Sequence, residues 1–284
     1  MQFDRKVICR VGPLEINRQA GDQLKVAFDI SKDISSRSND ATITLYNLKE
    51  SNRNSIGREF TTIELEAGYI GEDNIGLLFS GEIRDVQHRR EGMDILTEIQ
   101  CGEGDKANRK AFTSKAFPTG TKLSDAVNEF QKDLEKQGVA KGEWLDVDQL
   151  PTLTRPLVVA GSTKRAMDMV LRSYGYYWSV HNGSTMIFPA KKSLTGMVYI
   201  SPETGMIGDP TITDNGVKVD ALLNPEIQPG HRVQIESQTL EMNAANGVYR
   251  VSSVNYSGDD RDGDFKVSIH GERFQGGEVD QGEK

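Results

Sequence analysis

Cysteine and histidine are scarce in this chain of 284 residues, and their scarcity argues against a disulfide-stabilised protein and against a zinc protein. The two cysteines, Cys9 and Cys101, are too few for a disulfide framework, and we expect both to be reduced in a protein that folds in a cytoplasm. No two of the four histidines have zinc-ligand spacing, so we expect solvated side chains at strand edges: His88, His181, His231 and His270. The sequence therefore predicts neither a metal nor a cofactor.

Long apolar runs are missing as well. No stretch approaches the roughly 18 apolar residues of a membrane-spanning helix, and the N-terminal stretch lacks the apolar core of a signal peptide. We therefore expect neither membrane insertion nor export by a classical signal. Only 36% of residues are hydrophobic and the formal net charge is -8, which argues against a general nucleic-acid binder because such proteins carry a basic surface.

Motifs of catalysis are also lacking, because the chain has neither a Walker-type phosphate loop nor a G-x-S-x-G elbow. The acidic run at 259–264 would place Gly258 and Ile269 where a calcium loop needs carboxylates, so we interpret it as a solvated hairpin tip. We expect no enzymatic activity. A carbohydrate-binding or glycan-cleaving β protein stays the alternative from another class, with an acidic pair and an aromatic platform of Tyr174, Tyr176, Tyr177 and Trp178.

Alternating apolar and polar residues dominate what is present. Residues 1–110 contain several short alternating runs separated by turn residues, which predicts a first β unit, either a barrel or a sandwich. Residues 111–195 predict an inserted α+β domain with two helices and a β-hairpin. Residues 196–275 return to the β pattern and predict a second β unit, and we expect residues 276–284 to form a flexible C-terminal tail.

The inserted domain carries three local signals. One helix face is indicated by Leu123, Ala126, Val127, Phe130 and Leu134, with Thr121 as the expected N-cap. A second helix is expected to start at Ser162 and to bury Ala166, Met169 and Val170 on one side. Asn182-Gly183 lies between two alternating runs and predicts a tight hairpin.

The stretch 201–237 is a series of short strands separated by turn residues. Asp214-Asn215-Gly216 predicts a hairpin with positive φ angles, and the alternating runs 217–221 and 232–236 predict strands with one buried face. In addition, the pattern of 81–86 and 96–102 recurs in outline at 247–254 and 265–271. This recurrence indicates that the chain folds a similar β module twice.

The turn residues of this stretch occur in a characteristic order: TGMIGDP at 204–210, GV at 216–217, LLNP at 222–225 and PG at 229–230. This ordered set resembles the C-terminal barrel of phage baseplate hub proteins, and the patches 41–48, 65–69 and 79–81 resemble the N-terminal barrel of the same proteins. The resemblance implies two tube-like antiparallel β-barrels, a first at residues 1–110 and a second at residues 196–275. The resemblance assigns structural turn roles to one set of residues: Gly205, Gly208, Pro210, Leu223, Asn224, Pro225 and Gly230.

The resemblance implies a structural virion protein of the tail baseplate in contractile-tailed phages, assembled in the host cytoplasm. It implies a homotrimeric hub that joins the tail tube to the central spike and lines the DNA channel, since three chains with two barrels each match a six-fold tube. Implied partners are tail tube or tube-initiator proteins, the spike protein and other baseplate proteins. DNA only passes through the lumen, where acidic groups would repel it. A hexameric tube-initiator or adaptor ring is the alternative if only one barrel forms.

Overall fold

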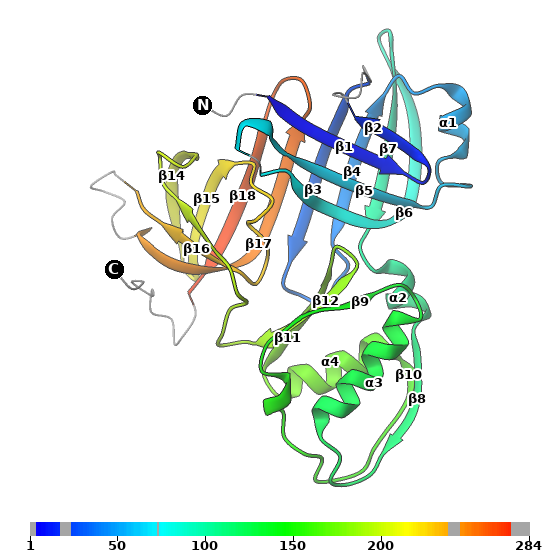
Figure 1. Ribbon diagram of the computed structural model, residues 1–284, viewed down its shortest axis with the longest axis vertical. Helices are drawn as coiled ribbons and strands as arrows, with labels where there is room; N and C mark the ends of the chain where they lie inside the picture. The colour runs from blue at the N-terminus through cyan, green and yellow to red at the C-terminus, as the bar shows by residue number, and fades with distance from the viewer. Residues whose placement is uncertain (1–3, 18–23, 73, 238–244, 274–284) are drawn as a thin grey trace.

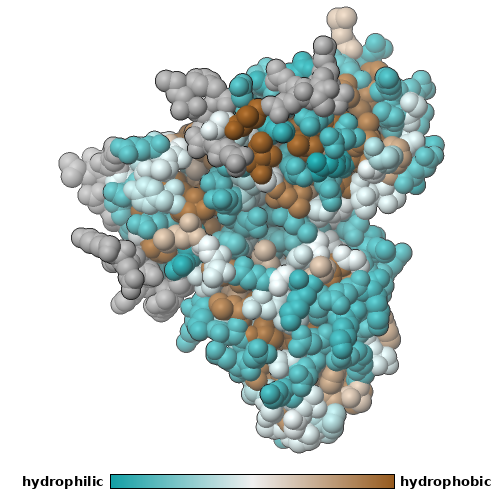
Figure 2. All heavy atoms as spheres, viewed as in Figure 1, coloured by the Kyte–Doolittle hydropathy of each residue, from teal (hydrophilic) through white to brown (hydrophobic). Residues whose placement is uncertain are grey.

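The structure is a computed structural model that describes residues 4–17, 24–72, 74–237 and 245–273. It is mainly β, with two curved antiparallel β units side by side and a smaller α+β unit beneath them (Figure 1). Figure 2 shows that hydrophilic residues cover most of the face toward the viewer, with hydrophobic groups over the β1 and β5 region. The predicted fold class, mainly β with an α+β insert, is confirmed.

The first β unit consists of strands that pair in the order β3-β4-β7-β6-β5-β1-β2, with every neighbouring pair antiparallel. Its strands are β1 (Arg5–Val11), β2 (Leu14–Asn17), β3 (Val26–Asp33), β4 (Asp40–Tyr46), β5 (Thr62–Tyr69), β6 (Gly76–Glu91) and β7 (Asp94–Gly102). Helix α1 (Glu50–Ser55) connects β4 to β5, and a short 3-10 turn, η2 (Ile70–Glu72), follows β5. Strands β1, β5 and β6 cross in front of β3 and β4, so the unit curls into a barrel-like shape (Figure 1).

The α+β unit combines helices with two small sheets, one of β8 and β10 and one of β11, β12 and β9. Its elements are α2 (Asp105–Lys110), β8 (Phe112–Phe117), α3 (Leu123–Glu135), β9 (Ala140–Trp144), η3 (Val147–Gln149), β10 (Leu157–Ser162), α4 (Thr163–Ser173), β11 (Tyr176–His181) and β12 (Ser184–Pro189). Its hydrophobic core is separate from that of the β units, because the side chains that form it all lie between Ala107 and Ile187.

Helix α3 buries the predicted face, since Leu123 and the other four apolar residues of that face are all buried. The prediction of its N-cap is wrong. Lys122 precedes the first turn, and the Thr121 hydroxyl donates to the Pro118 carbonyl at 2.8 Å instead of accepting from the helix. The hydroxyl is thus used by the preceding turn.

Helix α4 begins after Ser162, whose side chain accepts from the Arg165 backbone N–H, as the predicted start requires. Ala166 and Val170 face the core, but Met169 is half exposed, which corrects the prediction for that side chain. The Asn182-Gly183 hairpin is confirmed. Both residues have positive φ, 49° and 74°, and join β11 to β12 as a two-residue loop.

The second β unit follows the order β14-β15-β18-β17-β16-β13, antiparallel except for the parallel pair β13 and β16. Its strands are β13 (Met197–Ile200), β14 (Met206–Thr213), β15 (Gly216–Leu222), β16 (Arg232–Ile235), β17 (Gly247–Asp259) and β18 (Phe265–Glu272). The predicted hairpin between β14 and β15 forms, but residues 214–216 do not adopt positive φ. Gly216 is needed for another reason, since a Cβ there would collide with the Gly271 carbonyl on β18.

The two β units repeat one arrangement of strands, because β3-β4-β7-β6-β5 and β14-β15-β18-β17-β16 follow the same path. Strands β4 and β7 pair from Asp40↔Gly102 to Tyr46↔Leu96. Their counterparts β15 and β18 pair over the same length, as residues 216–222 of β15 oppose residues 272–266 of β18 in order. The repeat that the sequence indicates is therefore present in the strand pairing itself.

The long strands β6 and β17 show the repeat most sharply, since each carries a bulge at the same place. The bulge of β6 lies between Ile83 and Asp85, and that of β17 lies between Val251 and Ser253. Because the two bulges match residue 83 with residue 251, residue 86 corresponds to residue 254. The glycines that start the two similar sequence segments, Gly81 and Gly247, therefore do not correspond. A shift of two residues keeps the same side chains inward, so alternation alone could not detect it.

The two units join where β17 pairs with β3, from Ser253↔Asp33 to Asp259↔Ala27. One edge of β17 thus pairs first with β16 and then with β3, which makes a single 13-stranded sheet. The buried apolar side chains of both units also form one continuous core, from Val7 in the first to Ile269 in the second. Burial of this apolar surface is the main favourable contribution to the fold.

Candidate functional site

The junction of β17 with β3 brings the two β units together through buried apolar residues and an outer polar row. Ile30 opposes Tyr256, both are almost fully buried, and the Tyr256 hydroxyl donates to the Ile227 carbonyl. On the outer row, the Asn255 amide donates to Asp29 Oδ1 at 2.9 Å and to Ser31 Oγ at 3.1 Å. Side chains on both faces therefore fix the register of this junction.

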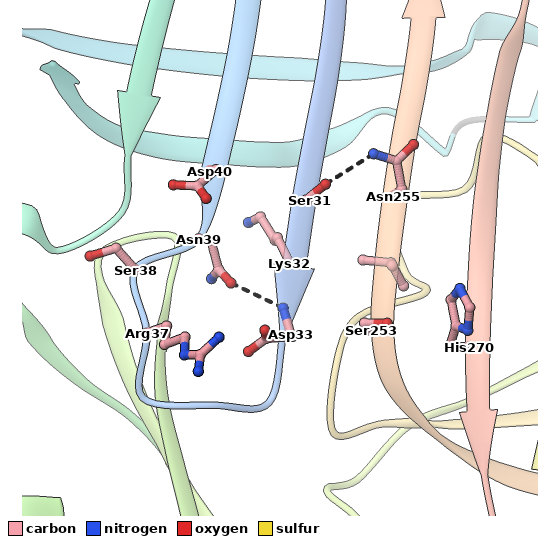
Figure 3. A pocket seen from close by; sticks show the side chains of 11 residues that line it. Ser31, Lys32, Asp33, Arg37, Ser38, Asn39, Asp40, Ser253, Asn255 and His270 are labelled. Atoms are coloured by element: carbon pink, nitrogen blue, oxygen red, sulfur yellow. Dashed lines mark hydrogen bonds between the residues drawn. The ribbon is translucent and has the colours of Figure 1, made fainter. Parts of the chain in front are cut away.

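A polar cavity of about 360 Å³ opens at the lower end of this junction. Figure 3 shows side chains of β3 and the following loop on one side, and Ser253, Asn255 and His270 of β17 and β18 on the other. The Asn39 side-chain oxygen accepts from the Asp33 backbone N–H at 3.0 Å, which orders the loop. The lining groups are side chains of one loop and of strands β3, β4, β17 and β18, and they do not form a nucleophile–base pair.

Behind the cavity lies a buried polar cluster, here called the polar joint, formed by Lys32, Asn39, Glu103, His181 and Asn182. The Lys32 ammonium lies 2.7 Å from Glu103 Oε1 and donates to Asn182 Oδ1 at 2.7 Å. Asn39 donates to Glu103 Oε2 at 2.7 Å, and the Asn182 backbone N–H donates to Glu103 Oε1 at 3.2 Å. The side chains of Lys32 and Glu103 are only 3% and 0% exposed. The polar joint therefore fastens the β11–β12 hairpin to the first β unit.

Burial determines the protonation states of the polar joint. Desolvation lowers the pKa of Lys32, and the Glu103 carboxylate opposes this by favouring the ammonium. Desolvation also lowers the pKa of His181 to about 3, with the Lys32 charge acting in the same direction. His181 is therefore neutral at physiological pH and bonds to Ser179 Oγ at 2.9 Å. The prediction of solvated, strand-edge histidines is wrong for His181, because the hairpin turns it into the interface.

We expect the protein to lose stability on mild acidification, because unfolded His181 binds a proton near pH 6.5 and folded His181 binds one only near pH 3. The contribution of His181 to stability is present above about pH 6.5 and is lost as the pH drops below that value. Between pH 7 and pH 5 the free energy of unfolding should decrease by about 2 kcal/mol through this residue. Urea unfolding at the two pH values measures the difference.

His181→Asn is the control for this pH effect, because it retains hydrogen-bonding groups and cannot titrate. Its stability should change less between pH 7 and pH 5 than that of the native chain. A smaller acid effect should remain, since burial also lowers the pKa of His231, against the influence of Glu143. Equal acid sensitivity of the variant and the native chain would contradict the assignment.

The predicted turn residues lie in the second β unit, in three places. Gly205 and Gly208 have φ of 110° and 68°, at the start of β14, and Pro210 lies in a bulge of that edge strand. Leu223 is fully buried and its N–H donates to the Phe265 carbonyl at 3.2 Å. Asn224 Oδ1 accepts from the Glu226 N–H at 2.9 Å, which makes an Asx turn.

Two turn residues reach other parts of the chain. Pro225 packs against Gly76 at the start of β6, where a Cβ would come within 2.9 Å of its ring. Gly230 has φ of 87° and lies against Leu194 and Phe188, which form part of a small core beneath the second unit. Its N–H donates to the Val251 carbonyl and its own carbonyl accepts from Leu194 N–H, both at 2.8 Å. The turn residues therefore do not converge on one site.

Sequence reasoning missed the polar joint, although one signal for it was available. The alternation of Leu24, Val26, Phe28 and Ile30 continues to position 32, which places Lys32 on the buried face. A lysine at an inward position needs a partner. Glu103 shows no such pattern, because it follows the end of β7, and only the folded chain brings the two together.

The other residues that the sequence singles out, the possible metal ligands, the acidic run and the two cysteines, do not form a site. Among the described residues, no three His, Cys, Asp or Glu side chains form a group that could hold a metal ion. In the acidic run, Asp260 is not solvated: it is buried, and its Oδ1 accepts from the Val26 N–H at 3.1 Å. Cys9 and Cys101 are both buried and free, and burial raises both thiol pKa values. No described helix is long and apolar enough to cross a membrane.

The aromatic cluster does not form one exposed surface. Trp178 is buried and its indole N–H donates to Asp168 Oδ1 at 2.9 Å, while Tyr177 packs against Phe188. The Tyr176 hydroxyl donates to the Asp146 carbonyl at 2.8 Å, and Tyr174 is 46% exposed. The members of the cluster thus serve the packing of helix α4 and strand β11.

Solved structures with the same fold include tail proteins. The 43 kDa tail protein of prophage MuSo2 from Shewanella oneidensis has a TM-score of 0.64 at 9% identity, over 98% of this chain and 99% of that one. A tail protein from Neisseria meningitidis MC58 has 0.64 at 10%, over 95% and 97%. The E. coli c3393 protein, a component of the type VI secretion system, has 0.65 at 9%, over 97% and 79%. Identities this low show the fold alone.

A comparison with curated protein sequences gives no match. The family described as "Baseplate hub gp41" matches residues 10–271, which include both β units and the α+β unit between them. This match spans the repeated strands, their junction and the polar joint. The chain is therefore a member of the baseplate hub gp41 family.

Proposed function

We propose that this baseplate protein is a trimeric hub that joins the tail tube to the central spike and lines the DNA channel. The observation that carries the proposal is the repeat of one β unit within the chain, with the two copies joined edge to edge by β17 and β3. Three such chains supply six equivalent units in a ring. That ring matches a six-fold tube on one side while it keeps three-fold symmetry for a spike on the other.

Charge supports a channel in which DNA passes without being held. The chain carries 42 acidic against 34 basic residues, and acidic groups toward a lumen repel a polyanion. The role is structural and non-enzymatic, and the protein is a part of the virion that assembles in the host cytoplasm. Its other partners are tube or tube-initiator proteins, the spike and further baseplate proteins, with the α+β unit on the outside of the ring.

Molar mass and particle symmetry test this proposal. Size-exclusion chromatography with light scattering should give three times the chain mass of 31.5 kDa, and electron-microscopic class averages should show a ring with six β units around a central hole. A ring of six chains would instead support the tube-initiator or adaptor role. A monomer that cleaves peptidoglycan would overturn the hub and support a glycan-cleaving protein.

A further inference from the structure

The repeat leaves two strand edges without the partner that their counterparts have. Because the bulges match residue 83 with residue 251, residues 85–91 of β6 correspond to residues 253–259 of β17. The β17 segment pairs with β3. The β6 segment pairs with β7 on one edge and, within the described chain, with no strand on the other.

The second open edge belongs to β14, the counterpart of β3. Strand β3 precedes β4, which pairs with β7, and β14 precedes β15, which pairs with β18. In the two hairpins, the pair Ser31↔Asp40 corresponds to the pair Thr213↔Gly216. Strand β3 is covered by β17, whereas β14 pairs only with β15 among the described strands. Exposed edges of this kind readily pair with another chain.

Exposure of equivalent side chains shows what the missing partner would cover. Ile30 on β3 is 0% exposed, and its counterpart Ile212 on β14 is 43% exposed. An exposed apolar side chain on an unpaired strand edge is a feature of a surface that another protein covers.

We propose that the open edge of β6 pairs antiparallel with β14 of a second copy of this chain, in the register of the internal junction. The pairing places Gln87 opposite Thr213, His88 opposite Ile212 and Arg89 opposite Thr211, as copies of the pairs formed by residues 255, 256 and 257 with residues 31, 30 and 29. The contact is heterologous, and three copies close the ring. This inference rests on the proposed trimer and names the surfaces that form it.

A double cysteine variant tests the register. Gln87→Cys and Thr213→Cys are both exposed and directly opposed in the proposed pairing, whereas Cys9 and Cys101 are buried. Mild oxidation of the purified full chain should convert most of it to a covalent trimer on a non-reducing gel. Each single variant should stay uncrosslinked, because a heterologous contact brings together two different edges.

The outcomes separate this inference from the proposed function. A trimer by light scattering whose double variant does not crosslink would overturn the register and leave the hub standing. A covalent dimer from Thr213→Cys alone would overturn it too, since it would show that two β14 edges meet. A native chain that is monomeric at all concentrations would overturn both the register and the trimeric hub.

A substitution of the exposed apolar residue gives an independent measurement. Ile212→Asp should raise the concentration at which the trimer dissociates at least tenfold, because it places a charge at the covered position. Val158→Asp is the matched control, as Val158 is 72% exposed on β10 of the α+β unit and should leave the trimer unchanged. Equal effects of the two substitutions, or no effect of Ile212→Asp, would count against the proposed edge.

Discussion

Glu103→Gln is expected to destabilise the protein by about 3–5 kcal/mol, because it leaves the buried Lys32 ammonium without its counter-charge. The size of the side chain and one acceptor oxygen are retained, so the effect reports the charge and not a cavity. The upper limit of the destabilisation is the cost of folding with a neutral Lys32. Removing the proton from a lysine that has a normal pKa in the unfolded chain costs about 5 kcal/mol at pH 7. Urea unfolding followed by circular dichroism measures the change.

The double variant Lys32→Met with Glu103→Gln separates the ion pair from the rest of the polar joint. Removing both charges should restore most of the stability that Glu103→Gln loses, since no buried charge then lacks a partner. Limited proteolysis gives a second measurement, because Glu103→Gln loosens the contact between the hairpin at Asn182 and the first β unit. Full additivity of the two single variants would show that Lys32 and Glu103 do not act as a pair.

Gly230→Val is expected to destabilise the protein by about 3 kcal/mol. Its φ of 87° lies where a β-branched side chain is strained, and a Cβ there lies 3.0 Å from both the Leu194 and the Phe188 side chains. Strain and crowding each contribute about 1–2 kcal/mol. Thermal unfolding should show a midpoint several degrees lower, because about 1 kcal/mol shifts the midpoint of a chain of this size by about 2–4 °C.

Gly208→Val is the matched control for this substitution. Gly208 also has a positive φ, 68°, but nothing lies within 4 Å of a Cβ built there. It should therefore show the strain alone and lose about half as much stability as Gly230→Val. If the two variants lose the same amount, the packing of Gly230 against Leu194 and Phe188 contributes nothing to stability.

Much of the fold follows from local chemistry that the sequence displays openly. The buried face of α3 and the positive-φ turn at Asn182-Gly183 depend only on neighbours in the chain, so periodicity and turn chemistry predict them. The β repeat was visible in outline for the same reason. The exact correspondence of residues was not, because the two copies are shifted by two residues relative to that outline, and such a shift leaves the same side chains facing inward.

The contacts that define the candidate site depend on residues far apart in the chain. Lys32 and Glu103 come into contact only because the fold brings β3 and the segment after β7 to the same hairpin. Residues 253–259 of β17 pair with β3, although the two strands lie near opposite ends of the sequence. Gly216 illustrates the same limit. The sequence indicates a glycine of a turn, whereas the fold uses it for close approach to β18.

The internal pairing of β17 with β3 has a thermodynamic consequence for assembly. In the proposed three-chain ring, half of the contacts between neighbouring units are already made within single polypeptides, where dilution cannot separate them. Only the other half carries the loss of translational and rotational freedom on association. Each chain therefore brings a preformed one-third arc, and the local concentration of its second unit beside the first is set by covalent connection.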